Sequence, residues 1–304
     1  MSISFNILND EIQESIERRH TREPLDAQSR KAGHAMYSTK ELFSPAAGKI
    51  RLGFVGLSAG AGATTICFAA SEYLAERVKE RKARFKPGFN QTVLEIAMLE
   101  LDMRTEAPAG RPYDKIGIDR RFAGRDFVSF YRLAAEGKPL HGVRNIYGGI
   151  NWALRVPGET GPVPDPAVIH RLISNTWGDI ILCDISAPGI LSGAGQHKGR
   201  DALLAILVDL DHIICVFDPL PSRLLASVQA AEACRAASAS GIPVTYLLNK
   251  LNAGVNLREV TRFTGIKDFL AFPAVPAEAV YTAEYACRSL APELSAPLSR
   301  LFPE

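Results

Sequence analysis

The sequence has little that would mark a secreted, metal-binding or strongly nucleic-acid-binding protein. Lys and Arg total 35 against 33 for Asp and Glu, and a net charge of +2 gives no overall field that would attract a polyanion. The five cysteines are scattered through the 304 residues, and no two are spaced as a pair of metal ligands. Nothing suggests a disulfide framework, so we expect a reducing, cytoplasmic environment.

No segment is apolar for long enough to cross a membrane. The longest apolar run, residues 202–217, is interrupted by Asp209 and Asp211, whereas a spanning helix needs about 20 apolar residues. Residues 1–20 are of mixed charge and lack the apolar centre of a secretory signal. Three prolines in residues 289–304 leave little room for an amphipathic membrane-binding helix. We therefore expect no direct membrane insertion.

The chain does contain a regular alternation of strand and helix patterns. Residues 1–45 are expected to form a flexible or loosely docked N-terminal arm, and residues 46–304 a single domain. The expected strands are Ile50–Leu57, Val93–Leu101, Ile150–Val156, Asp179–Ile185, His212–Phe217 and Val244–Leu248. The expected helices are Thr64–Glu80, Phe127–Glu136, Pro166–Asn175 and Ser222–Ser238. Near-continuous apolar strands separated by helices predict an α/β fold, a doubly wound, mostly parallel sheet with helices on both faces.

The first expected strand runs into a glycine-rich turn with the outline of a phosphate-binding loop. The small residues from Ser58 to Gly62 would let backbone N–H groups close around phosphate oxygens, and the following helix would add its dipole. An ordinary loop places a lysine just before the hydroxyl residue, but here that position is Ala63. Taken alone, the loop suits a nucleotide site and a ligand-free turn equally well.

Three further strand ends carry residues that a nucleotide site could use. Glu100 and Asp102 stand at the end of the second strand. Asp184 ends an apolar strand before an expected turn at 186–189, where a carboxylate can meet a Mg²⁺-bound water. The amide of Asn249 offers a donor and an acceptor, which suits the edge of adenine. Each acid also has a plainer interpretation, because acids at strand ends are commonly solvated or cap a turn.

Taken together, the four stretches resemble the ParA/MinD family of P-loop ATPases, whose members dimerise. The resemblance covers roughly residues 49–290 and implies that residues 46–304 form a ParA/MinD-like nucleotide-binding domain. The family's loop reads Lys-Gly-Gly-x-Gly-Lys-Thr-Thr, and this chain keeps the last two glycines and both threonines but has Ser58 and Ala63 in place of the two lysines. Such a degenerate loop is similar to that of CpaE/TadZ-type proteins, which localise pilus assembly.

The resemblance implies a set of site residues. Thr64 and Asp184 would hold Mg²⁺, and Asp102 would be the catalytic acid that orients the attacking water. The residues implied to bind ATP or ADP are Gly60, Ala61, Gly62, Ala63, Thr64, Thr65, Asn249 and Pro276. We expect slow or absent hydrolysis without the lysines, because phosphoryl transfer depends on positioning and charge neutralisation.

The function implied is a nucleotide-dependent homodimeric switch or scaffold that positions a cell-envelope machine such as pilus assembly. Its partners would recruit it from the cytoplasm to the membrane or a cell pole. The alternatives are a DNA- or plasmid-partitioning ATPase and a nucleotide-free adaptor. DNA binding would use a run of basic residues. The same run can be interpreted as the solvated C-terminal end of a helix, where the helix dipole favours cations. We prefer this second interpretation. The run consists of Arg77, Lys79, Arg81, Lys82, Arg84 and Lys86.

Overall fold

The computed structural model of the protein describes residues 37–44, 48–83, 94–101, 127–140, 142–156, 159, 166–193 and 196–304. Within them, eight strands form one sheet in the order β3-β4-β2-β5-β1-β6-β7-β8. The strands are β1 Ile50–Gly56, β2 Ile96–Leu101, β3 Ile146–Tyr147, β4 Ile150–Ala153, β5 Ile180–Ser186, β6 His212–Phe217, β7 Val244–Leu251 and β8 Leu270–Pro273. Only the β3–β4 pair of these strands is antiparallel, which confirms the predicted, mostly parallel sheet.

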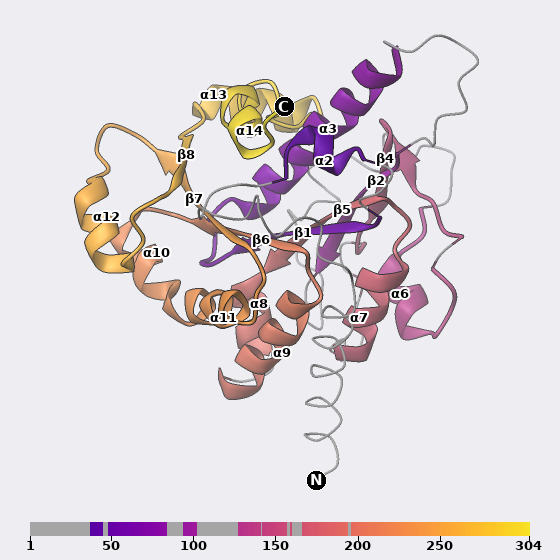
Figure 1. Ribbon diagram of the computed structural model, residues 1–304, viewed down its shortest axis with the longest axis horizontal. Helices are drawn as coiled ribbons and strands as arrows, with labels where there is room; N and C mark the ends of the chain where they lie inside the picture. Colours follow the sequence, from indigo (N-terminus) through magenta and orange to yellow (C-terminus); the bar gives the residue numbers. More distant parts are fainter. Residues whose placement is uncertain are drawn as a thin grey trace.

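Helices cover both faces of this sheet (Figure 1). The described helices are α2 Thr39–Leu42, α3 Ala63–Ala83, α6 Phe130–Ala135, α7 Pro166–Asn175, α8 Ala187–Gly193, α9 Gln196–Val208, α10 Pro221–Ala226, α11 Val228–Ala239, α12 Leu257–Thr264, α13 Ala277–Tyr285 and α14 Ser295–Leu301. None of the helices in these ranges is both long and apolar enough to span a bilayer.

Two apolar layers hold the helices to the sheet. Successive side chains of a strand point to opposite faces. In β1, Phe54 therefore joins the layer shared with α3 and α14, and Val55 joins the layer shared with α6 to α11. Because both faces are covered, the central strands carry apolar residues at nearly every position, and this explains the continuous apolar runs of the sequence.

The last residues of the expected N-terminal arm pack against the core. Ser38 and Glu41 form a capping box at the start of α2. Leu42 and Phe43 are buried in the same apolar layer as α14, and the Thr39 N–H donates to the carbonyl of Pro303 at 2.6 Å. Residues 37–44 thus belong to the folded body, and the rest of the arm lies outside the described residues.

The prediction of a turn after Asp184 is wrong. Residues 187–193 form α8, so Pro188 and Gly189 lie within a helix. Pro188 occupies the second position of α8, where a missing N–H breaks no intrahelical hydrogen bond. A Pro-Gly pair was therefore compatible with a helix start as well as with a turn.

The helix expected over Ser222–Ser238 is divided into α10 and α11. Ser227 separates the two helices, and both its N–H and its hydroxyl donate to the carbonyl of Leu224, at 3.1 and 2.7 Å. Helices α2, α9, α12 and α14 were not predicted.

Candidate functional site

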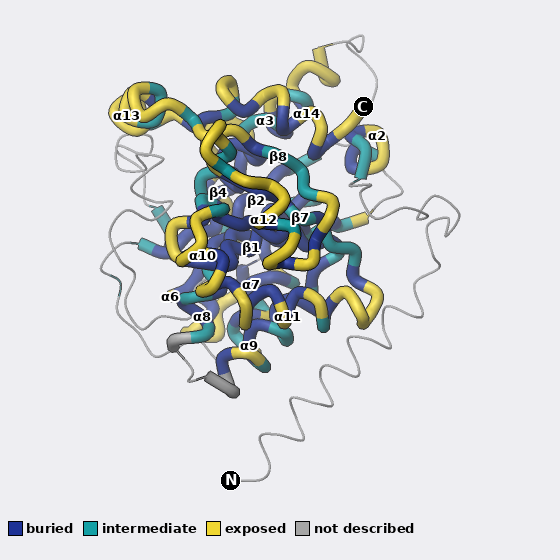
Figure 2. Tube along the Cα trace, turned by 90° about the vertical axis from the view of Figure 1, so that its left-hand side faces the viewer, coloured by how far each residue is buried: buried dark blue, intermediate teal, exposed yellow. Residues whose placement is uncertain are grey.

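The parallel strands bring most of the predicted site residues to one edge of the sheet. Strand β1, which carries the glycine-rich loop, lies between β5 and β6, with β2 and β4 beyond β5 and with β7 and β8 beyond β6. The strand order reverses at β1, and open α/β sheets bind ligands outside the carboxyl ends of strands at such a switch point. Helices α10, α12 and α13 follow the carboxyl ends of β6, β7 and β8, and they lie on the side of the molecule that is turned toward the viewer in Figure 2.

The loop between β1 and α3 is a tight turn with two left-handed glycines. The Ala61 N–H donates to the Ser58 carbonyl at 3.1 Å. Gly60 and Gly62 have φ of +75° and +91°, a backbone region that residues other than glycine rarely adopt. A Cβ at Gly62 would also lie 2.3 Å from the amide nitrogen of Asn249. Gly62 is therefore required by its backbone and by its neighbour.

Thr64 and Asp184 meet directly beneath the loop. The Thr64 hydroxyl donates to Oδ2 of Asp184 at 2.8 Å, and Asp184 is 2% exposed. Hydroxyl and carboxylate oxygens are donors that Mg²⁺ accepts, with phosphates and water completing its shell. No group of three or more His, Cys, Asp or Glu side chains in the described ranges could hold a metal by itself. The chemistry of the pair fits a Mg²⁺ ion, to which it would supply two oxygen ligands.

The start of α3 adds donors to the same place. The helix begins at Ala63, and the first N–H groups of a helix have no intrahelical partner. These groups carry the positive end of the helix dipole, which favours an anion. The loop thus offers backbone donors and a helix N-terminus beside a hydroxyl–carboxylate pair.

The end of β7 contacts the other side of the loop. The Asn249 amide nitrogen donates to the Ala61 carbonyl at 2.8 Å, and the Lys250 ammonium donates to the Gly60 carbonyl at 2.5 Å. Lys250 also pairs with Asp218, at the end of β6, at 2.8 Å. Asn249 was predicted as a site residue, whereas Lys250 and Asp218 were not.

Comparison with solved structures identifies the fold. A ParA family ATPase from Chlorobium tepidum superposes with a TM-score of 0.53 and 16% identity, covering 83% of this chain and 95% of that one. The cell division ATPase MinD of Pyrococcus furiosus gives 0.57 and 14%, covering 83% and 98%. The chain has the fold of the ParA and MinD ATPases.

Nucleotides are present in some of these similar structures. A putative plasmid partition protein from Borrelia burgdorferi, 9% identical with a TM-score of 0.56, was solved bound to AMPPNP, and it covers 83% of this chain and 98% of its own. MinD from Pyrococcus horikoshii, 14% identical with a TM-score of 0.57, was solved with Mg-ADP. Comparison with models of known protein families and with curated proteins finds no match.

Ser58 and Ala63, which stand where the ParA/MinD loop pattern has lysines, are both buried. Ala63 is 6% exposed and packs close to Gly56. Ser58 is 4% exposed, and its hydroxyl has no hydrogen-bond partner within the described residues. Position 58 therefore faces inward in this chain.

The remaining predicted residues take separate places. Thr65 lies in the first turn of α3 and is half-buried. Pro276 is exposed and precedes α13 as its N-cap residue. Asp102, the predicted catalytic acid, lies outside the described residues. Its neighbour on β2, Glu100, is fully buried and stands opposite Asp184 in the strand register.

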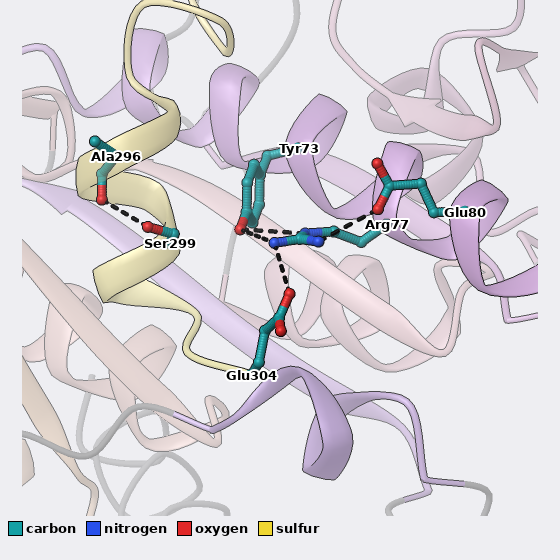
Figure 3. Close-up of polar contacts among 6 residues, drawn as sticks. All are labelled: Tyr73, Arg77, Glu80, Ala296, Ser299 and Glu304. Atoms are coloured by element: carbon teal, nitrogen blue, oxygen red, sulfur yellow. Dashed lines mark hydrogen bonds and ion pairs between the residues drawn. The ribbon is translucent and has the colours of Figure 1, made fainter.

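The described part of the basic run makes contacts within the chain. Arg77 pairs with Glu304 at 3.0 Å and with Glu80 at 3.3 Å, and its guanidinium also reaches the Tyr73 hydroxyl (Figure 3). Arg81 donates to the Phe43 carbonyl at 3.1 Å. These contacts give the two arginines a structural role in tying α3 to the segments packed beside it.

Proposed function

We propose that the protein is a nucleotide-dependent dimeric switch or scaffold of the ParA/MinD type, with weak or absent hydrolysis, that positions a cell-envelope machine such as pilus assembly. The observation that carries this proposal is the Thr64–Asp184 hydrogen bond beside a glycine-rich loop at the switch point of the sheet. ATP or ADP with Mg²⁺ is the proposed ligand. The nucleotides bound to structures of the same fold support it.

Each part of the site would take one task. The amides of Gly62 and Ala63 and the start of α3 would bind the phosphates. Thr64 and Asp184 would hold Mg²⁺, which when bound offsets part of the phosphate charge. One hydrogen of the Asn249 amide is used by the loop, and this leaves the oxygen and the second hydrogen for the edge of adenine.

Weak hydrolysis follows from the residues at the loop. No ammonium group is carried by the loop itself, since Ser58 and Ala63 stand where the family has lysines. Charge neutralisation in the transition state is a large part of phosphoryl-transfer catalysis. Asp102 would still orient a water, so a slow reaction remains within the proposal. An Ala63→Lys variant should then hydrolyse ATP faster than the wild type.

Exposed apolar side chains on the segment that follows the carboxyl end of β6 support dimerisation across this edge of the sheet. Leu220, just before α10, is 57% exposed, and Leu225 within α10 is 64% exposed. Val228, the first residue of α11, is 42% exposed. Apolar groups gathered on one face commonly mark an interaction surface. Two copies meeting here would close both loops. The envelope partner would bind the dimer elsewhere and recruit it to its place in the cell.

Titration with a fluorescent ATP analogue, with and without Mg²⁺, tests the nucleotide part. We expect saturable, Mg²⁺-dependent binding. The Asp184→Asn variant should lose this binding because it removes the carboxylate charge. It keeps an oxygen that can accept the hydrogen bond of Thr64. The absence of saturable binding below about 1 mM, or about 4 kcal/mol of affinity, would reject it. Sedimentation with and without Mg-ATP tests dimerisation.

A plasmid-partitioning ATPase is the second candidate, favoured by the fold shared with a Borrelia partition protein. It requires salt-sensitive DNA binding that is lost when Arg81 and Lys82 are neutralised, and retention of no DNA at low salt would dispose of it. A nucleotide-free adaptor would instead show the same thermal stability with and without Mg-ATP.

A further inference from the structure

Two neighbouring residues of β7 hold two neighbouring carbonyls of the loop. Asn249 binds the Ala61 carbonyl, and Lys250 binds the Gly60 carbonyl. In a regular strand, successive side chains point to opposite faces of the sheet. Adjacent residues of a regular strand could therefore not both reach the same loop.

The backbone of Lys250 removes this obstacle. Its φ is +57°, and among the described residues the other non-glycine residue with positive φ is Cys287. The pairing of β7 with β8 also shifts register between Leu248 and Leu251. This left-handed step turns the lysine side chain toward the same loop as Asn249. Such a conformation is uncommon for a lysine and persists where surrounding contacts enforce it.

Asp218 fixes the lysine ammonium group in this position. Its Oδ2 lies 2.8 Å from Nζ of Lys250, and its Oδ1 accepts the N–H of Leu220 at 3.1 Å. Asp218 is 3% exposed, so its carboxylate is held in place by the fold. Lys250 consequently joins three segments, namely the end of β6, the end of β7 and the loop.

The two contacts set which way the loop peptides face. In a trans peptide, the C=O and the following N–H point in opposite directions. Drawing the Ala61 carbonyl toward Asn249 turns the Gly62 N–H away from β7, and drawing the Gly60 carbonyl toward Lys250 turns the Ala61 N–H into the turn with Ser58. The donors of the loop are therefore oriented by β7.

We propose that Asn249 and Lys250 form a clamp that holds the loop in its phosphate-binding shape, with Lys250 as its positioning residue. This inference rests on the proposed nucleotide binding. The loop carries no lysine of its own to order it against phosphate. Its preorganisation comes from a cation fixed outside the loop, two strands away in the sheet.

Lys250→Gly in the full-length protein tests the clamp. Glycine accepts positive φ, so the variant removes the lysine contacts while relieving the backbone strain, which offsets part of the cost of leaving the buried Asp218 carboxylate without its lysine. We expect its dissociation constant for a fluorescent ATP analogue with Mg²⁺ to rise about tenfold. Amide hydrogen exchange of residues 58–64, measured without nucleotide, should speed up about tenfold. Lys267→Met, which removes an exposed lysine before β8, should change neither quantity.

The two measurements separate this inference from the proposed function. If the wild type binds the analogue and Lys250→Gly binds it equally tightly, the clamp is refuted. Unchanged exchange at residues 58–64 refutes it as well. The exchange measurement needs no nucleotide, so it decides the clamp even if the wild type binds no analogue, a result that would refute the proposed function alone. Lys250→Met provides a second variant that removes the cation but retains the strained backbone.

Discussion

Replacing Gly62 by alanine should be far more costly than replacing Gly60, although both glycines lie in the same loop. Both residues have left-handed backbones, and alanine there costs about 1 kcal/mol of folding free energy. A Cβ at Gly60 would meet nothing within 4 Å, whereas at Gly62 it would lie 2.3 Å from Nδ2 of Asn249. Displacing Asn249 should forfeit its hydrogen bond, about 1 kcal/mol, and add about 1 kcal/mol of overpacking. The expected totals are about 3 kcal/mol for Gly62→Ala and about 1 kcal/mol for Gly60→Ala.

A double-mutant cycle isolates the clash from the backbone strain. In an Asn249→Ala background the obstructing amide is absent, so Gly62→Ala should cost only its backbone part of about 1 kcal/mol. The coupling free energy between the two positions is therefore expected to be about 2 kcal/mol. Urea denaturation followed by the fluorescence of the buried Trp152 provides the measurement. If Gly62→Ala proves no worse than Gly60→Ala, or the coupling is near zero, Asn249 does not pack against the loop, and the arrangement of the site is wrong.

Three other changes test separate parts of the molecule. Thr64→Val keeps the shape but removes the hydroxyl that binds Asp184, so it should cost about 1 kcal/mol in urea denaturation and abolish the Mg²⁺ dependence of analogue binding. Phe302→Ala removes a fully buried ring that stacks on Tyr73 and should cost about 3–5 kcal/mol by the same assay. Burial raises the pKa of Cys183 to about 12. Because the unfolded thiol ionises near pH 8.5, the unfolded state binds fewer protons above that pH, and stability should fall as pH rises toward 12. Denaturation midpoints between pH 8 and 11 should fall less steeply in Cys183→Ala.

Elements with an unambiguous local pattern were predicted to the residue. Strand β6 spans His212–Phe217 and helix α7 spans Pro166–Asn175, as expected from the sequence. The strand is an apolar run between two aspartates, and the helix begins at a proline in its first position. Both signals lie within the segment itself, so no knowledge of its neighbours was needed.

The contacts that shape the site were beyond such reasoning because they join distant residues. Lys250 and Gly60 are 190 residues apart, and Asn249 and Ala61 are 188 apart. The positive φ of Lys250 leaves no trace in its residue type, since lysine gives no hint of a left-handed backbone. The inward position of Ser58 likewise depends on how the loop closes. The sequence shows which residue types stand at the strand ends, whereas tertiary structure decides which of them touch.

The charges around the loop explain why a metal ion matters to the proposed binding. The charge of Lys250 is offset by Asp218 at 2.8 Å, and Asp184 places a carboxylate beside Thr64. At an effective dielectric constant of 20, one carboxylate about 5 Å from a phosphate charge opposes it by about 3 kcal/mol. An ordinary loop lysine would cancel that repulsion, and Ala63 cannot. Backbone donors contribute only partial charges, so in the proposed binding a divalent cation shared by Asp184 and the phosphates would offset part of this repulsion.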